Sequence, residues 1–395
     1  MKAARVGSAL SPRDKKTIFG MIFLHGMNDM HSTALPTIIP MLAQSISLTL
    51  SQAGMLNAVF GLTNIFGQPV TGYIADRLKR PWFAVWGPLI SICGAALLPL
   101  APSYGAAFIF VGMMSLGTSL FHPQGTGRCG SSAGMNLAFY LSLFSASGGV
   151  GSSLGPLYIV FMISMLGKSC FPLVIIPFAA AVCFYVWRHA GFEVEPKAAS
   201  ERGSFIANLR LLASKILPIV SITSVRDGVY QSLRIFLPSL FIARGGSIEA
   251  GGAALFAVTF AASLAGIAGG RLADRIGDEK VLLGTLAVSP LFLITGIHSG
   301  GTVCFILLLV GFVFLQASTP VSTAMAQRRC PESRSMASSL AQGVSWGIAN
   351  LSVTPVGILA DHIGLQTAMN AVAFMPWTVA LWYWRGEAAA RAGAG

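Results

Sequence analysis

The sequence predicts an all-α integral membrane protein whose twelve transmembrane helices form two pseudo-symmetric six-helix bundles. Three observations lead to this prediction: the composition, the number of long apolar runs, and an internal repeat. Hydrophobic residues make up 54% of the chain and charged residues only 10%, whereas a soluble domain carries about 25% charged residues. Too few charges remain to cover a water-facing surface, so most of the chain must contact lipid or be buried.

Apolar runs long enough to cross about 30 Å of hydrocarbon occur twelve times along the chain. The expected spans are 18–43, 52–76, 82–101, 104–127, 134–160, 167–187, 214–243, 252–273, 281–297, 302–327, 335–360 and 366–385. The first run is longer than the apolar region of a signal peptide, so we interpret it as an uncleaved helix. One extended polar connection divides the chain into an N-terminal bundle (1–187), a cytoplasmic linker (188–213) and a C-terminal bundle (214–395).

The Lys and Arg residues predict the direction of insertion. With the N-terminus in the cytoplasm, nearly all 26 basic residues fall in cytoplasmic segments; Lys168 and Arg244 fall outside, and Arg226 and Arg234 lie within a span. This asymmetry follows the positive-inside rule and predicts that both termini are cytoplasmic. It also accounts for the net charge of +12 without a nucleic-acid partner. The six scattered cysteines show no metal-ligand spacing, so no metal is expected.

The two halves align at a constant offset, without a gap, through their first two helices. The paired positions include Asp29 with Asp227, Pro40 with Pro238, and Gly72–Arg77 with Gly270–Arg275. A six-helix unit duplicated in parallel is a transporter architecture, with the binding site near the midplane between the halves.

The short loops after spans 2 and 8 read GYIADRLKRP and GRLADRIGDEK. Both resemble the loop motif of the major facilitator superfamily, from which Lys79 and Asp278 depart. The resemblance implies that the glycine lets two helices approach, and that Asp and Arg form pairs that hold one conformation and break in the other. The candidate gating residues are Gly72, Asp76, Arg77, Gly270, Asp274 and Arg275. The alternative is a pair of solvated loops that only set topology.

Span 5 contains GGVGSSLGP, which is similar to a signature of drug-exporting antiporters in the superfamily. The spacing places Gly151 and Gly155 on one helix face, and Pro156 weakens the helix there. These three residues join the gating candidates, and ordinary glycine-mediated packing is the alternative explanation.

A denser resemblance covers roughly residues 20–160 and identifies the chain as a relative of the fosmidomycin resistance family. The matching segments are His25-x-x-Asn28-Asp29, Gln68–Tyr73, Phe121-His122-Pro123 and Gly151–Leu157. The resemblance implies the major facilitator fold, alternating access, a monomer, and a bacterial inner membrane. The family usually has Glu directly after the Phe-His-Pro motif, where this chain has Gln124, so a proton carrier expected there is missing.

Two helices carry charged side chains at membrane depth, where charge is costly and indicates function. In span 1, His25, Asn28 and Asp29 share one helix face because they are spaced i, i+3, i+4. In span 7 the same spacing places Asp227, Tyr230, Gln231 and Arg234 on one face. Since spans 1 and 7 line the central cavity in the superfamily, both faces are expected to point into it.

We predict that Asp29, with His25 beside it and Asp227 as its repeat equivalent, binds the coupling proton. The proton affinity of a carboxyl group depends on its burial and on neighbouring charges, which differ between the two states of a transporter. Arg226 or Arg234 would hold an anionic substrate, since guanidinium binds carboxylate and phosphonate bidentately. The candidate substrate-binding residues are Asn28, Arg226, Tyr230, Gln231, Arg234, His122 and Gln124. A static charge network would explain the same residues.

The sequence contains no HExxH, GxSxG or P-loop motif, so we expect neither an enzyme nor an ATP-driven pump. Energy for transport would then come from the proton gradient, without a cofactor. The expected activity is proton-coupled efflux of a small anionic compound, such as a phosphonate antibiotic. The alternatives are a proton-symport importer of a small organic anion, facilitated diffusion, and a membrane sensor.

Overall fold

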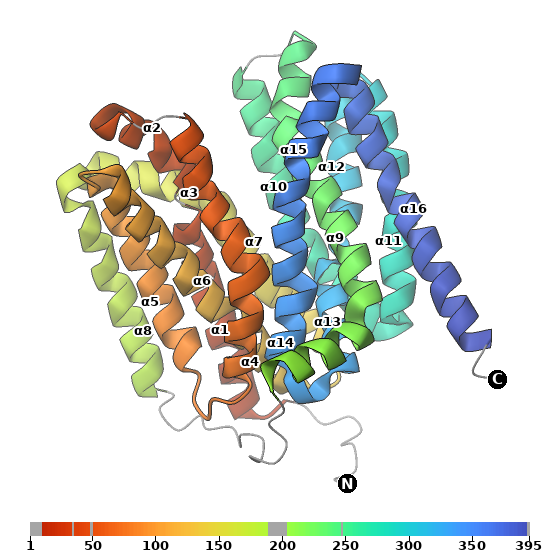
Figure 1. The fold of residues 1–395 in the computed structure, drawn as a ribbon, viewed down its shortest axis with the longest axis horizontal. Helices are drawn as coiled ribbons and strands as arrows, with labels where there is room; N and C mark the ends of the chain where they lie inside the picture. Colours follow the sequence, from red (N-terminus) through yellow and green to blue (C-terminus); the bar gives the residue numbers. More distant parts are fainter. Residues whose placement is uncertain (1–9, 34, 48–49, 189–203, 246–247, 393–395) are drawn as a thin grey trace.

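A computed structural model describes residues 10–33, 35–47, 50–188, 204–245 and 248–392. Every regular element within these ranges is helical. Helices that follow one another end to end make up one rod, and the elements form twelve rods, six in each half of the chain. Figure 1 shows the two halves standing side by side. Within the described part of the chain, eight helices are long and apolar enough to cross a membrane, and Lys168–Phe184 adds a shorter apolar one. The predicted all-α membrane architecture is therefore confirmed.

The rods of the N-terminal half follow the chain in order. They are α1 (Pro12–Ser32) with α2 (Leu35–Ile46); α3 (Leu50–Leu62) with the π-helix η1 (Thr63–Gly67) and α4 (Gln68–Ala75); α5 (Trp82–Leu97) with the 3₁₀ turn η2 (Leu98–Leu100); α6 (Tyr104–Ser132); α7 (Leu137–Leu166); and the 3₁₀ segment η3 (Lys168–Val174) with α8 (Ile175–Arg188).

The rods of the C-terminal half repeat this arrangement. They are α9 (Phe205–Ala243); α10 (Ile248–Ile276); α11 (Asp278–His298); α12 (Gly301–Ala317) with α13 (Thr319–Arg329); the 3₁₀ turn η5 (Pro331–Ser333) with α14 (Arg334–Ser338), the π-helix η6 (Ser339–Val344) and α15 (Ser345–Ile363); and α16 (Leu365–Ala392).

The first rod is broken into two helices, whereas the sequence led us to expect one continuous span over 18–43. Helix α1 ends at Ser32 and α2 begins at Leu35. Pro36 has no backbone N–H to donate to the carbonyl of Ser32, which weakens the helix at this turn and favours a break there. The hydroxyl group of Thr33 instead donates to the carbonyl of Asp29 at 2.9 Å. The end of α1 therefore lies one turn beyond Asp29.

The seventh rod begins at Phe205, nine residues before the expected span over 214–243. The ring of Phe205 packs edge-to-face on Tyr73 of α4, with 5.3 Å between centroids. The first turn of α9 thus lies against the N-terminal half. Residues 189–203, which make up most of the predicted linker, lie outside the described residues, so the division into bundle, linker and bundle stays a prediction.

Helix α7 lies directly on the backbone of α1 because three glycines face it. A Cβ added at Gly151 would overlap the carbonyl oxygen of Gly26, and one at Gly155 would overlap that of Met30. A Cβ at Gly148 would overlap the ring of His25. Small residues permit such close helix approach in a membrane. The close contact holds α1 in one orientation, with its polar face toward the space between the halves.

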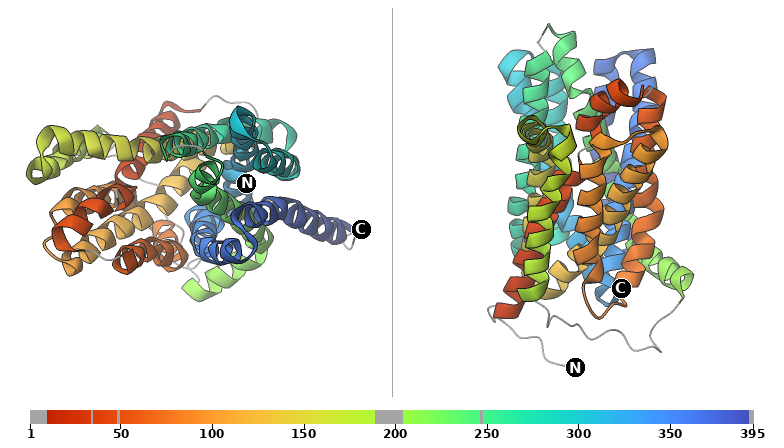
Figure 2. Two further views of the ribbon diagram at one scale, coloured as in Figure 1. Left: turned by 90° about the horizontal axis from the view of Figure 1, so that it is seen from above. Right: turned by 90° about the vertical axis from the view of Figure 1, so that its left-hand side faces the viewer.

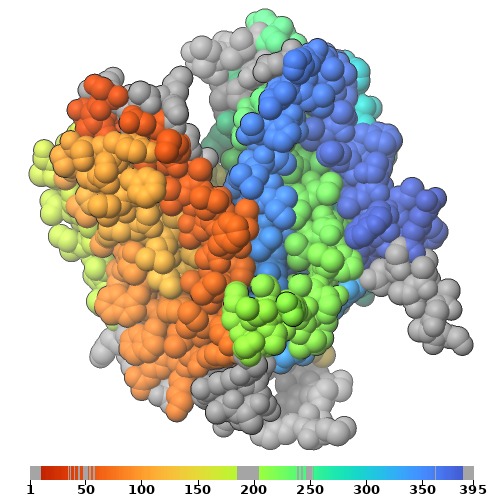
Figure 3. Space-filling model, in the orientation of Figure 1, coloured from red at the N-terminus to blue at the C-terminus, as the bar shows by residue number. Residues whose placement is uncertain are grey.

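The halves meet at one end of the molecule and part at the other. Figures 1 and 3 show them packed together toward the end that carries both chain termini, and separated at the opposite end. Viewed along the rods, as in the left panel of Figure 2, each half is a cluster of helices with a boundary between the clusters.

Replacing Gly151 by Ala should lower the free energy of unfolding by about 1–3 kcal/mol, because the added methyl group overpacks the contact between α7 and α1. The matched control is Gly112→Ala in α6, where a Cβ would meet nothing within 4 Å. Thermal unfolding followed by tryptophan fluorescence in detergent measures both variants. Equal unfolding temperatures would contradict the close packing of α7 on α1.

Candidate functional site

At the end where the halves meet, two repeat-related aspartates cap helices of the opposite half. Asp76 accepts hydrogen bonds of 3.0 and 3.1 Å from the backbone N–H groups of Ser335 and Met336, in the first turn of α14. Asp274 accepts bonds of 3.2 and 2.8 Å from two N–H groups in the first turn of α7. A carboxylate in this position satisfies free N–H groups and interacts favourably with the helix dipole. We call these the rim contacts.

Close backbone approach accompanies the rim contacts. A Cβ at Gly72 would lie 3.0 Å from the backbone of α14, and one at Gly270 would overlap the carbonyl oxygen of Ala138 in α7. Arg334 and Gln327 also donate across the boundary to backbone carbonyls of α6, at 2.8 and 3.2 Å. Together these contacts close this end of the molecule.

The remaining gating candidates lie elsewhere. Arg77, which follows α4, donates to the carbonyl of Tyr73 in that helix at 2.8 Å and stacks on the Tyr73 ring. Arg275 is exposed, and Pro156 is exposed within α7. The cation beside Asp274 is Arg328 of α13, at 2.7 Å, a residue that the loop motif does not include.

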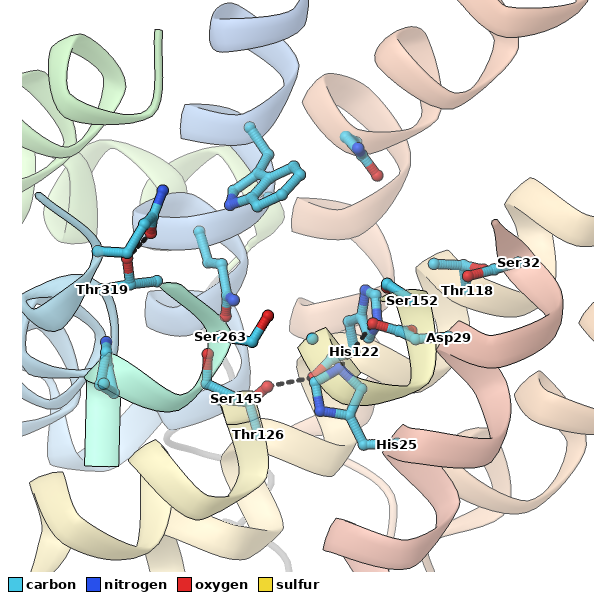
Figure 4. Close-up of a pocket in the computed structure, with 18 of the residues that line it drawn as sticks. His25, Asp29, Ser32, Thr118, His122, Thr126, Ser145, Ser152, Ser263 and Thr319 are labelled. Atoms are coloured by element: carbon cyan, nitrogen blue, oxygen red, sulfur yellow. Dashed lines mark hydrogen bonds and ion pairs between the residues drawn. The ribbon is translucent and has the colours of Figure 1, made fainter. Parts of the chain in front are cut away.

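Directly behind the rim contacts, a cavity of about 310 Å³ lies between the halves. Small-molecule sites typically measure about 300–1,000 Å³. Figure 4 shows that polar side chains of both halves point into it. The polar side chains that line it include His25, Asp29, Ser32, Thr118, His122 and Ser152 from the N-terminal half, and Tyr230, Arg234, Ser263, Gln316, Thr319 and Asn350 from the C-terminal half.

The carboxylate of Asp29 lies between two imidazoles on one wall of the cavity (Figure 4). Its Oδ1 is 3.0 Å from Nε2 of His122, and its Oδ2 is 3.2 Å from Nε2 of His25. Asn28 donates to Oδ1 at 2.9 Å. We call His25, Asp29 and His122 the Asp29 cluster. Its third member comes from α6, and the sequence had placed His122 among the substrate-binding candidates.

The orientation of His25 requires a positive charge or a proton beside Asp29. Its Nδ1 lies 2.6 Å from the carbonyl oxygen of Phe144, and a carbonyl only accepts, so Nδ1 carries a hydrogen. Nε2 then faces the carboxylate. In a neutral imidazole this nitrogen would present a lone pair to Asp29, which is unfavourable. A proton on either group, or another cation, must therefore lie between His25 and Asp29.

On the opposite wall, α9 presents Tyr230 and Arg234. The guanidinium carbon of Arg234 lies 5.8 Å from the centre of the Tyr230 ring. The Nε of Arg234 is buried, and no hydrogen-bond partner for it is found among the described residues. Arg234 therefore places a permanent positive charge at the cavity, across from the Asp29 cluster.

Arg226 and Asp227 do not line the cavity. Nε and Nη2 of Arg226 donate to Oδ1 of Asp227 at 3.0 and 2.9 Å, and Nη1 donates to Ser322 of α13 at 3.1 Å. Their exposures are 1% and 0%. An ion pair this deeply buried, with a hydrogen-bonded partner, has the character of a fixed structural element. The repeat equivalent of Asp29 is thus neutralised inside the protein.

Three further candidates also lie outside the cavity lining. Asn28 is fully buried and supports Asp29. Gln231 donates to Asn350 at 2.8 Å. The Oε1 of Gln124 accepts from the backbone N–H of Ala84, in the first turn of α5, at 2.8 Å. A glutamate at position 124 would meet the same N–H group, outside the cavity lining. The presence of Gln124 instead of Glu therefore does not affect Asp29, the acidic group that lines the cavity.

Sequence reasoning missed some of the cavity residues. Asn64 in η1 and Trp346 next to η6 both line the cavity, and the two π-helices lie on opposite sides of the boundary between the halves. A π-helix often marks a functional position. A polar amide within the second span was a signal that could have identified Asn64, although Asn57 and Gln68 lie in the same span. Trp346 resembles a packing residue.

Comparisons with known proteins agree with this architecture. Residues 18–226 match the family model of the Major Facilitator Superfamily. The chain is 29% identical over 384 residues to the fosmidomycin resistance protein of Escherichia coli K12, covering 94% of this chain and 93% of that protein. It is 23% identical over 393 residues to a probable 4-methylmuconolactone transporter of Cupriavidus pinatubonensis, covering 94% and 90%.

The fold is similar to that of a solved structure, the Escherichia coli fucose:proton symporter FucP. The TM-score is 0.77 at 15% identity, over 93% of this chain and 97% of that one. At this identity the likeness concerns the fold, and it confirms the predicted major facilitator fold.

Replacing Asp76 by Ala should loosen the first turn of α14. Loss of a helix cap costs about 0.5–2 kcal/mol, so deuterium exchange of the amides in this turn should accelerate several-fold in mass-spectrometric measurements. The control is Asp278→Ala, because Asp278 is paired with Arg328 of the same half. Unchanged exchange in the Asp76 variant would mean that the cap does not hold the rim.

Proposed function

The chain belongs to the major facilitator superfamily, and we propose that it uses the proton gradient to export a small anionic compound. Membership of this superfamily makes it a multi-pass membrane transporter and not an enzyme. One observation supports the proposed coupling and substrate class above all others. The cavity has a carboxylate between two imidazoles on one wall and, on the other, an arginine for which the described residues supply no carboxylate partner.

The Asp29 cluster is suited to binding and releasing a proton. His25 is fixed by the carbonyl of Phe144 and directs Nε2 at the carboxylate. His122 is 26% exposed and lines the cavity, so it connects the carboxylate to whichever side of the membrane the cavity faces. Histidine changes its charge near neutral pH, and movement of α6 relative to α1 would change the proton affinity of the group.

Arg234 is suited to binding the anion. Its guanidinium can donate two parallel hydrogen bonds to a carboxylate or phosphonate, and Tyr230 and Asn350 offer further polar groups on the same wall. Arg226 is left out of this site because Asp227 and Ser322 already occupy its donors. Proton and anion would thus be held by different halves across one cavity.

Alternating access would require the rim contacts to break. With both termini in the cytoplasm, as the Lys and Arg distribution predicts, the closed end faces the cytoplasm and the structure corresponds to an outward-facing state. Opening this end releases the caps on α14 and α7, and a new closure must form at the end where Figure 3 shows the halves apart. The bacterial relatives favour an inner membrane, and we propose a monomer.

The direction of transport is proposed from the relative with the stated resistance function. Similarity over nearly the full length of the fosmidomycin resistance protein favours export. The second candidate is proton-symport import of a small organic anion, which the similarity to a probable 4-methylmuconolactone transporter favours. Both use the same cavity and cluster, and the sign of substrate movement under an imposed proton gradient separates them.

Expression in a drug-sensitive bacterium should raise the tolerated fosmidomycin concentration, and Asp29→Asn should abolish this protection. The variant keeps the size of the side chain but removes the carboxylate between the two imidazoles. The matched control is Asp14→Asn at the exposed start of α1, which should protect as the parent does. Protection by Asp29→Asn at every pH would overturn the proton role. Absence of protection by a well-expressed parent would overturn this substrate and direct attention to uptake.

Replacing Arg234 by Gln should weaken binding of the transported anion by about 1.5–3 kcal/mol, the range for hydrogen bonds to charged groups. Substrate-induced quenching of tryptophan fluorescence measures the change, with Arg210→Gln on the exposed face of α9 as control. An unchanged affinity in the Arg234 variant would place the anion elsewhere.

A further inference from the structure

We propose that the Asp29 cluster also binds a divalent transition-metal ion of the Zn²⁺ type, and that the bound ion inhibits transport. The first part concerns binding alone and does not require transport. The second part, that Zn²⁺ inhibits transport, rests on the proposed function.

The donor atoms match a zinc site in kind and in spacing. Two imidazole nitrogens and a carboxylate form a common ligand set for Zn²⁺. Ligands about 2.0–2.1 Å from a tetrahedral ion lie roughly 3.3 Å from one another. Here the carboxylate oxygens lie 3.0 and 3.2 Å from the two Nε2 atoms, and one donor atom from each residue can be chosen so that all three lie within 4.8 Å of one another. Rotation of the partly exposed His122 ring closes the remaining difference.

The groups behind the donors fix their orientation. Metal-binding histidines almost always donate their second ring hydrogen to a carbonyl or carboxylate, and His25 does so to Phe144 at 2.6 Å. Asn28 donates to Oδ1 of Asp29 at 2.9 Å. The His25 ring is also stacked on the Phe144 ring, with 4.0 Å between centroids. The nitrogen of His25 is thus aimed at Asp29 before any ion arrives.

The electrostatic requirement of the cluster favours a cation. The lone pair of His25 Nε2 and the carboxylate face each other, so a positive species must lie between them. A divalent ion bound to both Nε2 atoms and to the carboxylate satisfies this requirement. All three residues line the cavity, which leaves a fourth coordination position open to water and to entry of the ion.

The ligand set selects the class of metal. Imidazole nitrogen suits Zn²⁺, Cu²⁺ and Ni²⁺, whereas Ca²⁺ and Mg²⁺ require oxygen ligands. Asp29 is the one carboxylate among the described residues that line the cavity. No metal was expected from the sequence, because His122 lies 93 residues from Asp29 along the chain and no short motif joins them.

Zinc titration of the tag-free protein in detergent, followed by isothermal calorimetry, tests the binding. The parent should bind one Zn²⁺ per chain, and His122→Gln and Asp29→Asn should each weaken the affinity at least about tenfold. The control His298→Gln removes an exposed histidine that interacts with Gln366 and Asn370 outside the cavity, and it should bind as the parent does. Absent binding by the parent, or equal affinity in the His122 and Asp29 variants, would overturn the proposal.

Zinc-edge X-ray absorption of the parent gives a second measurement that needs no variant to fold. Two imidazole ligands are expected, and sulfur ligands would overturn the proposal by placing the ion at cysteines. In proteoliposomes Zn²⁺ should reduce proton-driven uptake or export of substrate. Zinc that binds at the cluster without reducing transport would overturn the second part. If the parent transports no tested anion, the proposed function fails while the binding result stands.

Discussion

A charge at membrane depth needs a partner, and this requirement is met in two different ways at two positions that the internal repeat makes equivalent. Asp227 receives two hydrogen bonds from Arg226, and both are sealed inside the C-terminal half. Asp29 lies between two imidazoles at the wall of the cavity. The first solution uses a permanent cation and full burial, whereas the second uses partners whose charge can change and which water can reach. The glycines of α7 serve the second solution, because they bring α7 close enough to hold His25 in place.

The two halves thus differ in the charge that they present to the cavity. On α9 the cation at the cavity is Arg234, two helical turns beyond Asp227, so the C-terminal half presents positive charge where the N-terminal half presents a carboxylate. Both charges line one cavity of about 310 Å³. Charges that share a cavity inside a protein interact more strongly than charges in bulk water. In the proposed function, occupancy of one wall would therefore alter the affinity of the other, which is what coupling requires.

The fold could be predicted because its signals are local: each span is a continuous apolar run, and the repeat keeps one register. The break after Ser32 lies just before Pro36, whereas several other prolines of this chain lie inside helices that continue without a break. The start of α9 at Phe205 coincides with a contact to Tyr73 from the other half. For the site, helical spacing correctly placed His25 and Asp29 together. It could not show that His122 joins them, since only tertiary packing brings α6 to α1.

The arginines illustrate a further limit of helical spacing. Neighbouring positions on a helix point about 100° apart, so a helical wheel places Arg226 and Asp227 on different faces. The arginine side chain is long enough to bend back, and its guanidinium reaches the neighbouring carboxylate. Position on a helical wheel describes the Cβ direction well, but it describes the end of a long flexible side chain poorly. Short side chains such as Asp29 were accordingly easier to place than Arg226, Gln124 or Gln231.

The rim contacts have a consequence for how this protein can evolve. Asp76 and Asp274 bind main-chain N–H groups of α14 and α7, and every residue except proline supplies such a group. Selection on these contacts therefore acts on the two aspartates, whereas the side chains at positions 138, 139, 335 and 336 are constrained by their own packing and not by these hydrogen bonds. Compensating pairs of substitutions, which reveal many contacts in sequence families, would not accumulate here. The hydrogen bonds that keep one end of the transporter closed would thus produce almost no covariation between residue positions.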